Sequence, residues 1–266
     1  MEQALSALPH LAEGDERILQ LLVAEPPSHP RNCFRCAIQH LNLSYSLHAL
    51  DPAMAMFRAI TAEEEAASGL LRCLIDRRYP LAEHLRPKDH LQKHAVTPFL
   101  QSILQHLSNL RFDGLHSVRL AVKEVEGVER LVVAMHIGQS EEEVWATAIP
   151  PLNMSFREGP AMTAPTFNLD FKRLMEPKGY KNVRRFLESE ANLRNRILYA
   201  APDGIPIVQN LKVEFLVDRQ HRVLLILKAL LLISPYAEHQ PFVVEALHAF
   251  LTLVGKLNAE PLSNEA

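Results

Sequence analysis

The chain has 266 residues, of which 48% are hydrophobic and 22% charged, and it carries a net charge of -3 at neutral pH. A chain of this length and composition buries a core as one large domain or two smaller ones, so disorder is not expected. The small negative charge gives no overall attraction to nucleic acid or to an anionic membrane, and binding to either would need a local basic patch.

The cysteine content and the N-terminal sequence favour a cytoplasmic protein. Its three cysteines, an odd and low number, are more typical of a reducing compartment than of a disulfide framework. The segment 1–22 carries Glu2 and no basic region before an apolar run, so we expect no signal peptide. The longest apolar run, 223–233, is interrupted by Lys228 and is too short to cross a bilayer, so no membrane anchor is expected.

Helical periodicity dominates up to residue 110. The three- and four-residue spacing of apolar side chains predicts helices over 33–50, 51–76 and 85–110. A proline-rich connector at 24–32 precedes the first of these helices. Asp51 and Pro52 are typical of an N-cap and a first helical position. Pro98 is expected to kink the third helix or to mark its true start.

The period changes from helical to two after residue 111. Two alternating segments flank Glu126 and Gly127 and predict a hairpin, with a third strand following at 144–149. A long loop is expected over 150–170, and a second hairpin with its turn at 219–221. Helices are expected over 180–200 and 239–257.

This order of elements predicts an α+β fold, in which an N-terminal helical block packs with an antiparallel sheet of hairpins and a C-terminal helix. We divide the chain into a helical region at 1–110 and an antiparallel sheet with two helices at 111–266. The alternative, that both parts form one continuous domain, stays open.

Three consecutive glutamates interrupt the predicted helix at 51–76. On a helix, Glu64 falls within the apolar stripe and should face the core, whereas Glu63 lies in the neighbouring row. Glu65 falls with Arg58 and Arg72 on a face expected to be wet. A buried ionised carboxylate is costly unless it is paired or bound to a metal, so Glu64 needs a partner.

Histidines of the helical block are the candidate partners. His90 and His94 are one helical turn apart, and His40 occupies a stripe position on the first predicted helix. Carboxylates and imidazoles from several helices can together hold a divalent metal, and the predicted ligands are Glu63, Glu64, His90 and His94. The alternative is a salt bridge or a hydrogen-bonded network within the core.

A second group of metal-ligating residue types consists of Cys33, Cys36 and His40, with Cys73 further along the chain. Two cysteines and a histidine could supply three zinc ligands. Structural zinc sites, however, usually place the cysteine pair on a turn rather than in a helix. We therefore favour an interpretation in which these residues are part of a helical packing face.

Arg35 and His40 form an arginine, four residues, histidine pattern that resembles the ribonuclease motif of the HEPN superfamily. The segment "AITAEEEAASGLLRCLI" is similar to the acidic-then-small helix of the abortive-infection branch of that superfamily. The resemblance covers at most residues 33–76. In the family, the motif lies on a late helix and a polar residue usually follows the arginine, whereas here the pattern lies early and Cys36 follows the arginine. It implies that one of the two residues stabilises charge on a phosphodiester and the other acts as acid or base.

Other sequence features leave the partner open. The chain has no phosphate-binding glycine loop, dinucleotide fingerprint, nucleophile elbow or kinase motif. The basic segment 172–185 could contact a nucleic-acid backbone, but its glutamates favour a solvated helix face. A homo-oligomer is compatible with the sequence, and no membrane partner is expected.

Two functions therefore remain as hypotheses. The first is a binding or interaction module in which Glu64 and the histidines form a core polar network. The second is a metal-assisted hydrolase of a phosphoester or nucleic acid, with catalytic candidates Glu64, His90, His94, His40 and Arg35.

Overall fold

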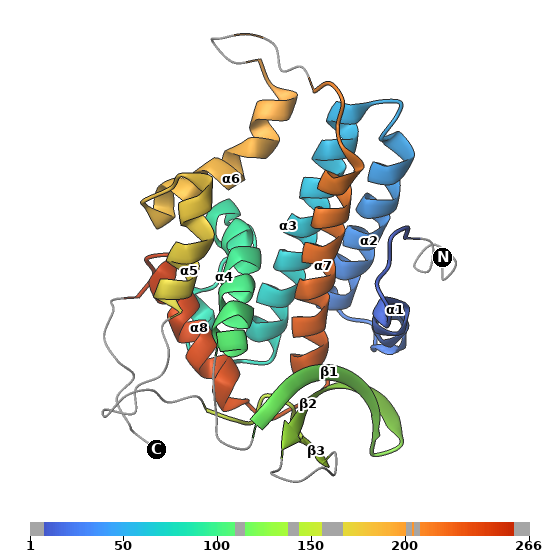
Figure 1. Cartoon of the computed structure of the whole chain (residues 1–266), viewed down its shortest axis with the longest axis vertical. Coiled ribbons are helices and arrows are strands. Elements are labelled where there is room, and N and C mark those ends of the chain that lie inside the picture. The colour runs from blue at the N-terminus through green and yellow to red at the C-terminus, as the bar shows by residue number, and fades with distance from the viewer. Residues whose placement is uncertain are drawn as a thin grey trace. The chain divides into compact units, whose positions relative to one another are not determined.

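The computed structural model describes residues 8–109, 115–137, 144–155, 167–200, 204 and 208–257. Over these residues it contains helices α1 to α8 and one three-stranded antiparallel sheet, which confirms the α+β class (Figure 1). In this part of the chain, no helix combines the length and the apolar character needed to cross a membrane.

The chain divides into two compact units, and neither unit is a continuous segment. The first contains residues 1–73, 86–97 and 182–230, and the second contains 74–85, 98–181 and 231–266. Helices α3, α4 and α7 each contribute residues to both units. The division at residue 110 that the sequence suggested stays a prediction.

The first unit begins with α1 (Asp15–Ala24), α2 (His29–Leu47) and the greater part of α3 (Pro52–Asp76). The oxygens of Ser28 and Asp51 cap α2 and α3 by accepting hydrogen bonds from backbone N–H groups of their first turns. The predicted helices at 33–50 and 51–76 are thus confirmed, the first of them beginning earlier, within the proline-rich connector. Helices α2, α3 and α7 run side by side in Figure 1.

Helix α3 packs closely on α2 at Gly69. A Cβ atom at Gly69 would lie 2.8 Å from a ring carbon of Phe34 and 3.1 Å from Cβ of Cys33. The expectation that this face of α3 is wet is therefore wrong: Ala62 and Ser68 are buried and Glu65 is half-buried. Small residues on this face let the neighbouring helix approach and exclude water.

Helix α4 (His90–Asn109) is fixed at its start by Asp89, whose Oδ1 accepts hydrogen bonds from the N–H groups of Leu91 and Gln92 at 2.9 and 3.3 Å. His90 is therefore the first residue of the helix. Pro98 lies inside the helix and does not mark its start. Because proline has no N–H group, it donates no hydrogen bond to the carbonyl of His94 four residues earlier.

The first unit is completed by α6 (Val183–Leu198) and most of α7 (Val213–Ile233). The helix predicted over 180–200 is confirmed, but the second hairpin is wrong, because 213–233 is one continuous helix. A period of 3.6 is not visible in its apolar run, because the half-buried face carries Leu225 and Ala229, which are as apolar as the buried residues. The fully buried members of the run are Val223, Leu224, Ile226, Leu227 and Leu230.

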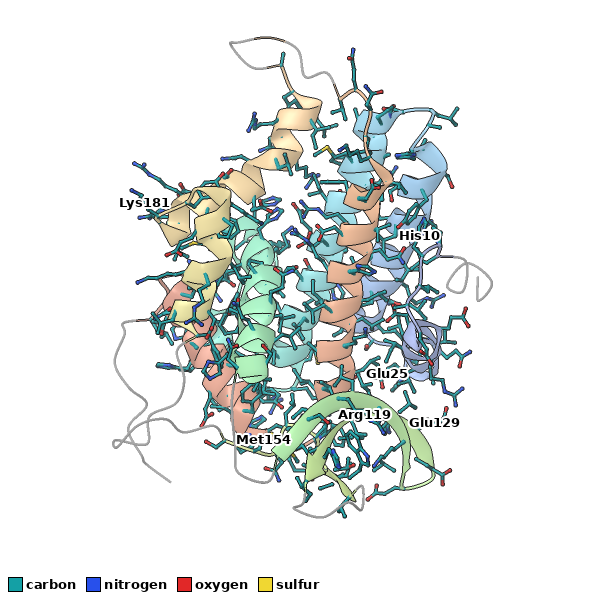
Figure 2. All side chains as sticks on the ribbon, viewed as in Figure 1. His10, Glu25, Arg119, Glu129, Met154 and Lys181 are labelled. Atoms are coloured by element: carbon teal, nitrogen blue, oxygen red, sulfur yellow. The ribbon has the colours of Figure 1, made fainter. Side chains whose placement is uncertain are left out.

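The second unit contains the sheet. Strands β1 (Leu115–Val125) and β2 (Val128–Ile137) form the predicted hairpin, and β3 (Val144–Thr147) pairs with β2 as the third strand. Figure 2 labels Arg119 on β1 and Glu129 on β2. The guanidinium of Arg119 lies 3.8 Å from the ring centroid of Trp145 on β3.

Helices α5 (Asn168–Met175) and α8 (Pro241–Leu253) also belong to the second unit, and α8 confirms the predicted C-terminal helix. Four phenylalanines form an edge-to-face cluster in this unit: Phe99, Phe167, Phe242 and Phe250. Of the long loop predicted over 150–170, residues 150–155 have no helix or strand, α5 begins at residue 168, and 156–166 lie outside the described residues.

Candidate metal centre

Two adjacent carboxylates on α3 enter the interior of the first unit. Glu63 and Glu64 are both 3% exposed. Consecutive residues of a helix point about 100° apart around its axis, so the two side chains meet different neighbours. The inward position predicted for Glu64 is confirmed, and Glu63 is buried to the same degree.

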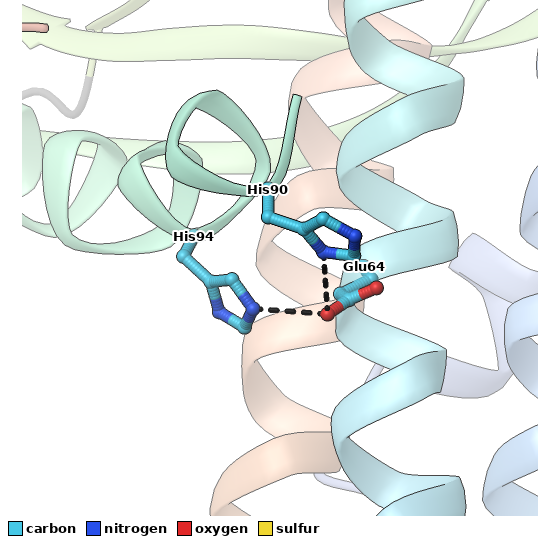
Figure 3. A group of neighbouring side chains, drawn as sticks. All are labelled: Glu64, His90 and His94. Carbon is cyan, nitrogen blue, oxygen red and sulfur yellow. Dashed lines mark hydrogen bonds and ion pairs between the residues drawn. The ribbon is translucent and has the colours of Figure 1, made fainter. Parts of the chain in front are cut away.

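One oxygen of Glu64 faces the two histidines of α4. Its Oε1 lies 3.0 Å from Nε2 of His94 and 3.4 Å from Nδ1 of His90 (Figure 3). The side chain of His94 is 3% exposed, whereas that of His90 is 55% exposed. The cap at Asp89 and the one-turn spacing of the histidines place both rings at this oxygen.

The other oxygen of Glu64 faces two cations. Its Oε2 accepts hydrogen bonds from Nζ of Lys93 at 3.0 Å and from Nη1 of Arg194 at 3.3 Å. Burial alone raises the pKa of Glu64, but the hydrogen bonds from His94 and Lys93 outweigh it and lower the pKa to about 2. Glu64 is thus an ionised carboxylate whose two oxygens have different partners.

Glu63 belongs to a separate network with α7. Its Oε2 accepts a hydrogen bond from Arg219, and its Oε1 lies 3.7 Å from Nη1 of Arg222. Both arginines also lie 3.9 Å from Oε2 of Glu190 on α6. Burial raises the pKa of Glu63, and the charges of Arg219 and Arg222 lower it to about 2. The prediction that Glu63 is a metal ligand stays a prediction, and its observed partners are arginines.

The donor atoms of Glu64, His90 and His94 have the spacing of a metal site. One ligand atom from each lies within 4.8 Å of the others, and among the described residues this is the group of three that meets the condition. Ligand atoms about 2.0–2.1 Å from a tetrahedral Zn²⁺ lie about 3.3 Å from one another. The distances from Oε1 to the two imidazole nitrogens, 3.0 and 3.4 Å, are close to that value.

Arg35 and His40, the two residues of the ribonuclease-like pattern, are not part of the group formed by Glu64, His90 and His94. Five residues on a helix correspond to about 140° around its axis, and both Arg35 and His40 are half-buried on α2. His40 contacts Arg58 of α3, whose Nη1 lies 3.2 Å from Nδ1 of the ring. The catalytic roles suggested for Arg35 and His40 stay predictions.

The cysteines lie on helices, as the favoured interpretation expected. Cys33 and Cys73 are buried and Cys36 is half-buried, and none of the three is in the group of converging ligand atoms. Burial, followed by the charge of Glu65, raises the pKa of the Cys33 thiol to about 11. The thiol is therefore protonated at neutral pH, which is unfavourable for metal binding.

The sequence did not identify the cations around the two glutamates. Lys93 lies between the two predicted histidines, and its position on the same turn was a usable signal. Arg194 falls in the helix predicted over 180–200, for which no contact with α3 was predicted, and Arg219 was assigned to the turn of a hairpin. Neither assignment could place these arginines beside α3.

No known protein family, curated protein or solved structure matches this chain significantly.

Proposed function

We propose that the first unit binds a divalent metal ion through Glu64, His90 and His94 and that the protein is a metal-assisted hydrolase of an anionic ester. The observation that carries the proposal is the approach of two imidazole nitrogens to one oxygen of a buried, ionised carboxylate. Two histidines and a glutamate are a ligand set of hydrolytic zinc sites, in which water completes the coordination.

The exposure of the ligands supports a catalytic rather than a structural metal. Structural zinc sites are closed by four protein ligands, whereas catalytic sites keep one position open. Glu64 and His94 are buried, and His90 lies at the solvent boundary. A bound divalent ion would lower the pKa of a water molecule at the open position and polarise the ester.

Lys93 and Arg194 affect the centre in two ways. Their bonds to Oε2 fix the orientation of the carboxylate, as outer partners of metal ligands do. Their charges also repel a cation, which lowers the metal affinity. The same charges attract an anionic substrate, so the arrangement favours an anionic ester over a neutral one.

The same contacts support a second candidate, a binding module with a metal-free polar network. Lys93 and Arg194 neutralise Glu64 without any ion, and a buried carboxylate with such partners is already satisfied. The two candidates differ in whether the histidines have a function beyond their contacts with Glu64.

Metal binding separates the candidates. We expect the purified protein to bind Zn²⁺ or another divalent transition metal, measured by competition with a chromophoric chelator. Glu64→Gln should weaken binding by about 100-fold or more, because even changes next to a metal ligand cost roughly 10–100-fold. Glu65→Gln is the matched control, since it removes the neighbouring charge of the same run and should leave the affinity unchanged.

Either of two results would favour the metal-free network. One is a wild-type protein that does not compete with the chelator, and the other is equal affinity in Glu64→Gln and in the wild type. Hydrolysis is then tested with a chromogenic phosphate ester and the metal-loaded protein, with His94→Gln as the inactive control.

A further inference from the structure

Arg58 is a half-buried cation whose partner carries no charge. Its Nη1 lies 3.2 Å from Nδ1 of His40, and its buried Nε has no hydrogen-bond partner among the described residues. Over the same residues, Arg58 forms no ion pair, whereas Arg194, Arg219 and Lys93 each contact a glutamate. A guanidinium in this state has unused capacity to bind an anion.

The contact with Arg58 also fixes which nitrogen of His40 carries the proton. A guanidinium can only donate hydrogen bonds, so Nδ1 of His40 accepts and the proton of the neutral ring is on Nε2. Burial, followed by the charges of Arg58 and Arg194, lowers the pKa of His40, which keeps the ring neutral at neutral pH. His40 therefore offers one N–H donor, and Nε2 has no partner among the described residues.

Arg194 supplies the second guanidinium. It lies over the ring of Phe57, the residue before Arg58, with 4.9 Å between its guanidinium carbon and the ring centroid. Its side chain is 32% exposed, and one of its nitrogens contacts Glu64. The charge of Arg194 also lowers the pKa of His40, so this guanidinium lies within electrostatic range of that ring.

We propose that Arg58, His40 and Arg194 bind the phosphate group of a phosphate ester, which is the substrate of the hydrolase proposed above. Two guanidiniums match the charge of a phosphate dianion better than that of a singly charged carboxylate. Their planar N–H groups also fit the phosphate oxygens. Arg194 also contacts the metal ligand Glu64, so one of the two proposed phosphate-binding guanidiniums adjoins the metal centre. The inference rests on the proposed function for the role of the ester as substrate, but the anion site can be tested without any metal.

The test measures phosphate binding by the full-length, metal-free protein in the presence of EDTA. Isothermal titration with a nucleoside monophosphate and with inorganic phosphate should show binding of both, with the ester at least as tight. Arg58→Gln should weaken binding of the ester by about tenfold, and Arg58→Lys less, because lysine keeps the charge and loses the planar donors.

Arg72→Gln is the matched control. Arg72 is on the same face of α3 and hydrogen bonds to Cys33 rather than to a histidine, so this variant should bind the ester like the wild type. Circular dichroism of each variant shows whether it is folded. If Arg58→Gln does not fold, Arg58→Lys keeps the test decisive.

Two results would overturn the phosphate site. One is the absence of ester binding at millimolar concentration, and the other is unchanged binding in a folded Arg58 variant. Because EDTA removes metal, these results do not depend on the metal centre, and a failure of Zn²⁺ binding leaves them intact.

Discussion

At the scale of residues, the two oxygens of Glu64 have different environments. Oε1 faces two imidazoles, whose contacts with this oxygen can be replaced by bonds to a metal ion. Oε2 is held by Lys93 and Arg194. A carboxylate bound from one side by fixed cations keeps its orientation while the other oxygen exchanges partners. This division is what makes a metal centre compatible with a buried, already neutralised glutamate.

His40 gives the fold a predictable dependence on pH. Its pKa in the folded protein lies below the ordinary value near 6.5, chiefly because of burial and then because of Arg58 and Arg194. Between the two pKa values the unfolded chain binds more protons than the folded one. The stabilising contribution is therefore complete above about pH 6.5 and is lost as the pH falls.

The prediction concerns the slope of stability with pH. Urea unfolding between pH 5 and 7.5 should show a smaller loss of unfolding free energy at low pH in His40→Gln than in the wild type. Comparing the two proteins removes the contribution of the other twelve histidines. An identical slope in both would mean that His40 does not titrate as its surroundings indicate.

At the scale of elements, the contact between α2 and α3 depends on the missing side chain at Gly69. In an open helix, Gly→Ala stabilises by about 1 kcal/mol. Here the new Cβ would lie 2.8 Å from a ring carbon of the fully buried Phe34, and overpacking of this kind costs about 1–3 kcal/mol. We expect Gly69→Ala to lower the unfolding free energy by about 1 kcal/mol, measured in urea.

A second substitution identifies the cause. In a Phe34→Leu background the ring is absent, and Gly69→Ala should cost less than in the wild type or become stabilising. Equal costs in both backgrounds would exclude the contact with Phe34 as the reason.

The sequence predicted those elements whose boundaries carry local signals. Asp51 and Pro52 marked the start of α3, and Glu126 with Gly127 marked the turn between β1 and β2. Helix α7 was missed because the half-buried face of its apolar run carries Leu225 and Ala229 beside Lys228, so the sequence shows little helical period.

The candidate centre was predictable only in part. The helical spacing put Glu64 inward and His90 and His94 on one turn, and the structure brings these three together. Arg194 is 130 residues from Glu64 in the sequence. Arg219 is 156 residues from Glu63. No local pattern encodes contacts over such separations.

At the scale of the whole molecule, the first unit needs segments that lie far apart in the sequence. Its carboxylates come from α3, and the arginines that contact them come from residues 182–230. A fragment of residues 1–110 would leave Glu63 without Arg219 and Arg222, and would expose the apolar surface that α7 covers. We expect this fragment to lack a cooperative urea transition and dispersed amide signals in NMR spectra, in contrast to the full chain.

The fragment also tests the predicted helical region at 1–110. A sharp unfolding transition of the fragment alone would show that this region is a domain in its own right. Adding the separate fragment 111–266 should restore cooperative unfolding if the two fragments associate as the segments of the first unit do.

The interrupted path of the chain has a consequence during synthesis on the ribosome. The 84 residues from 98 to 181 separate the early segments of the first unit from its last one. At about 5–20 residues per second, their translation takes roughly 4–17 s. During that interval the nascent α3 has neither α6 nor α7 beside it. Glu63 is then hydrated instead of paired with its arginines, whereas the α4 partners of Glu64 have already been made. The carboxylate of Glu63, which later forms buried contacts with α7, thus keeps an unfinished helical surface soluble until its partners have been made.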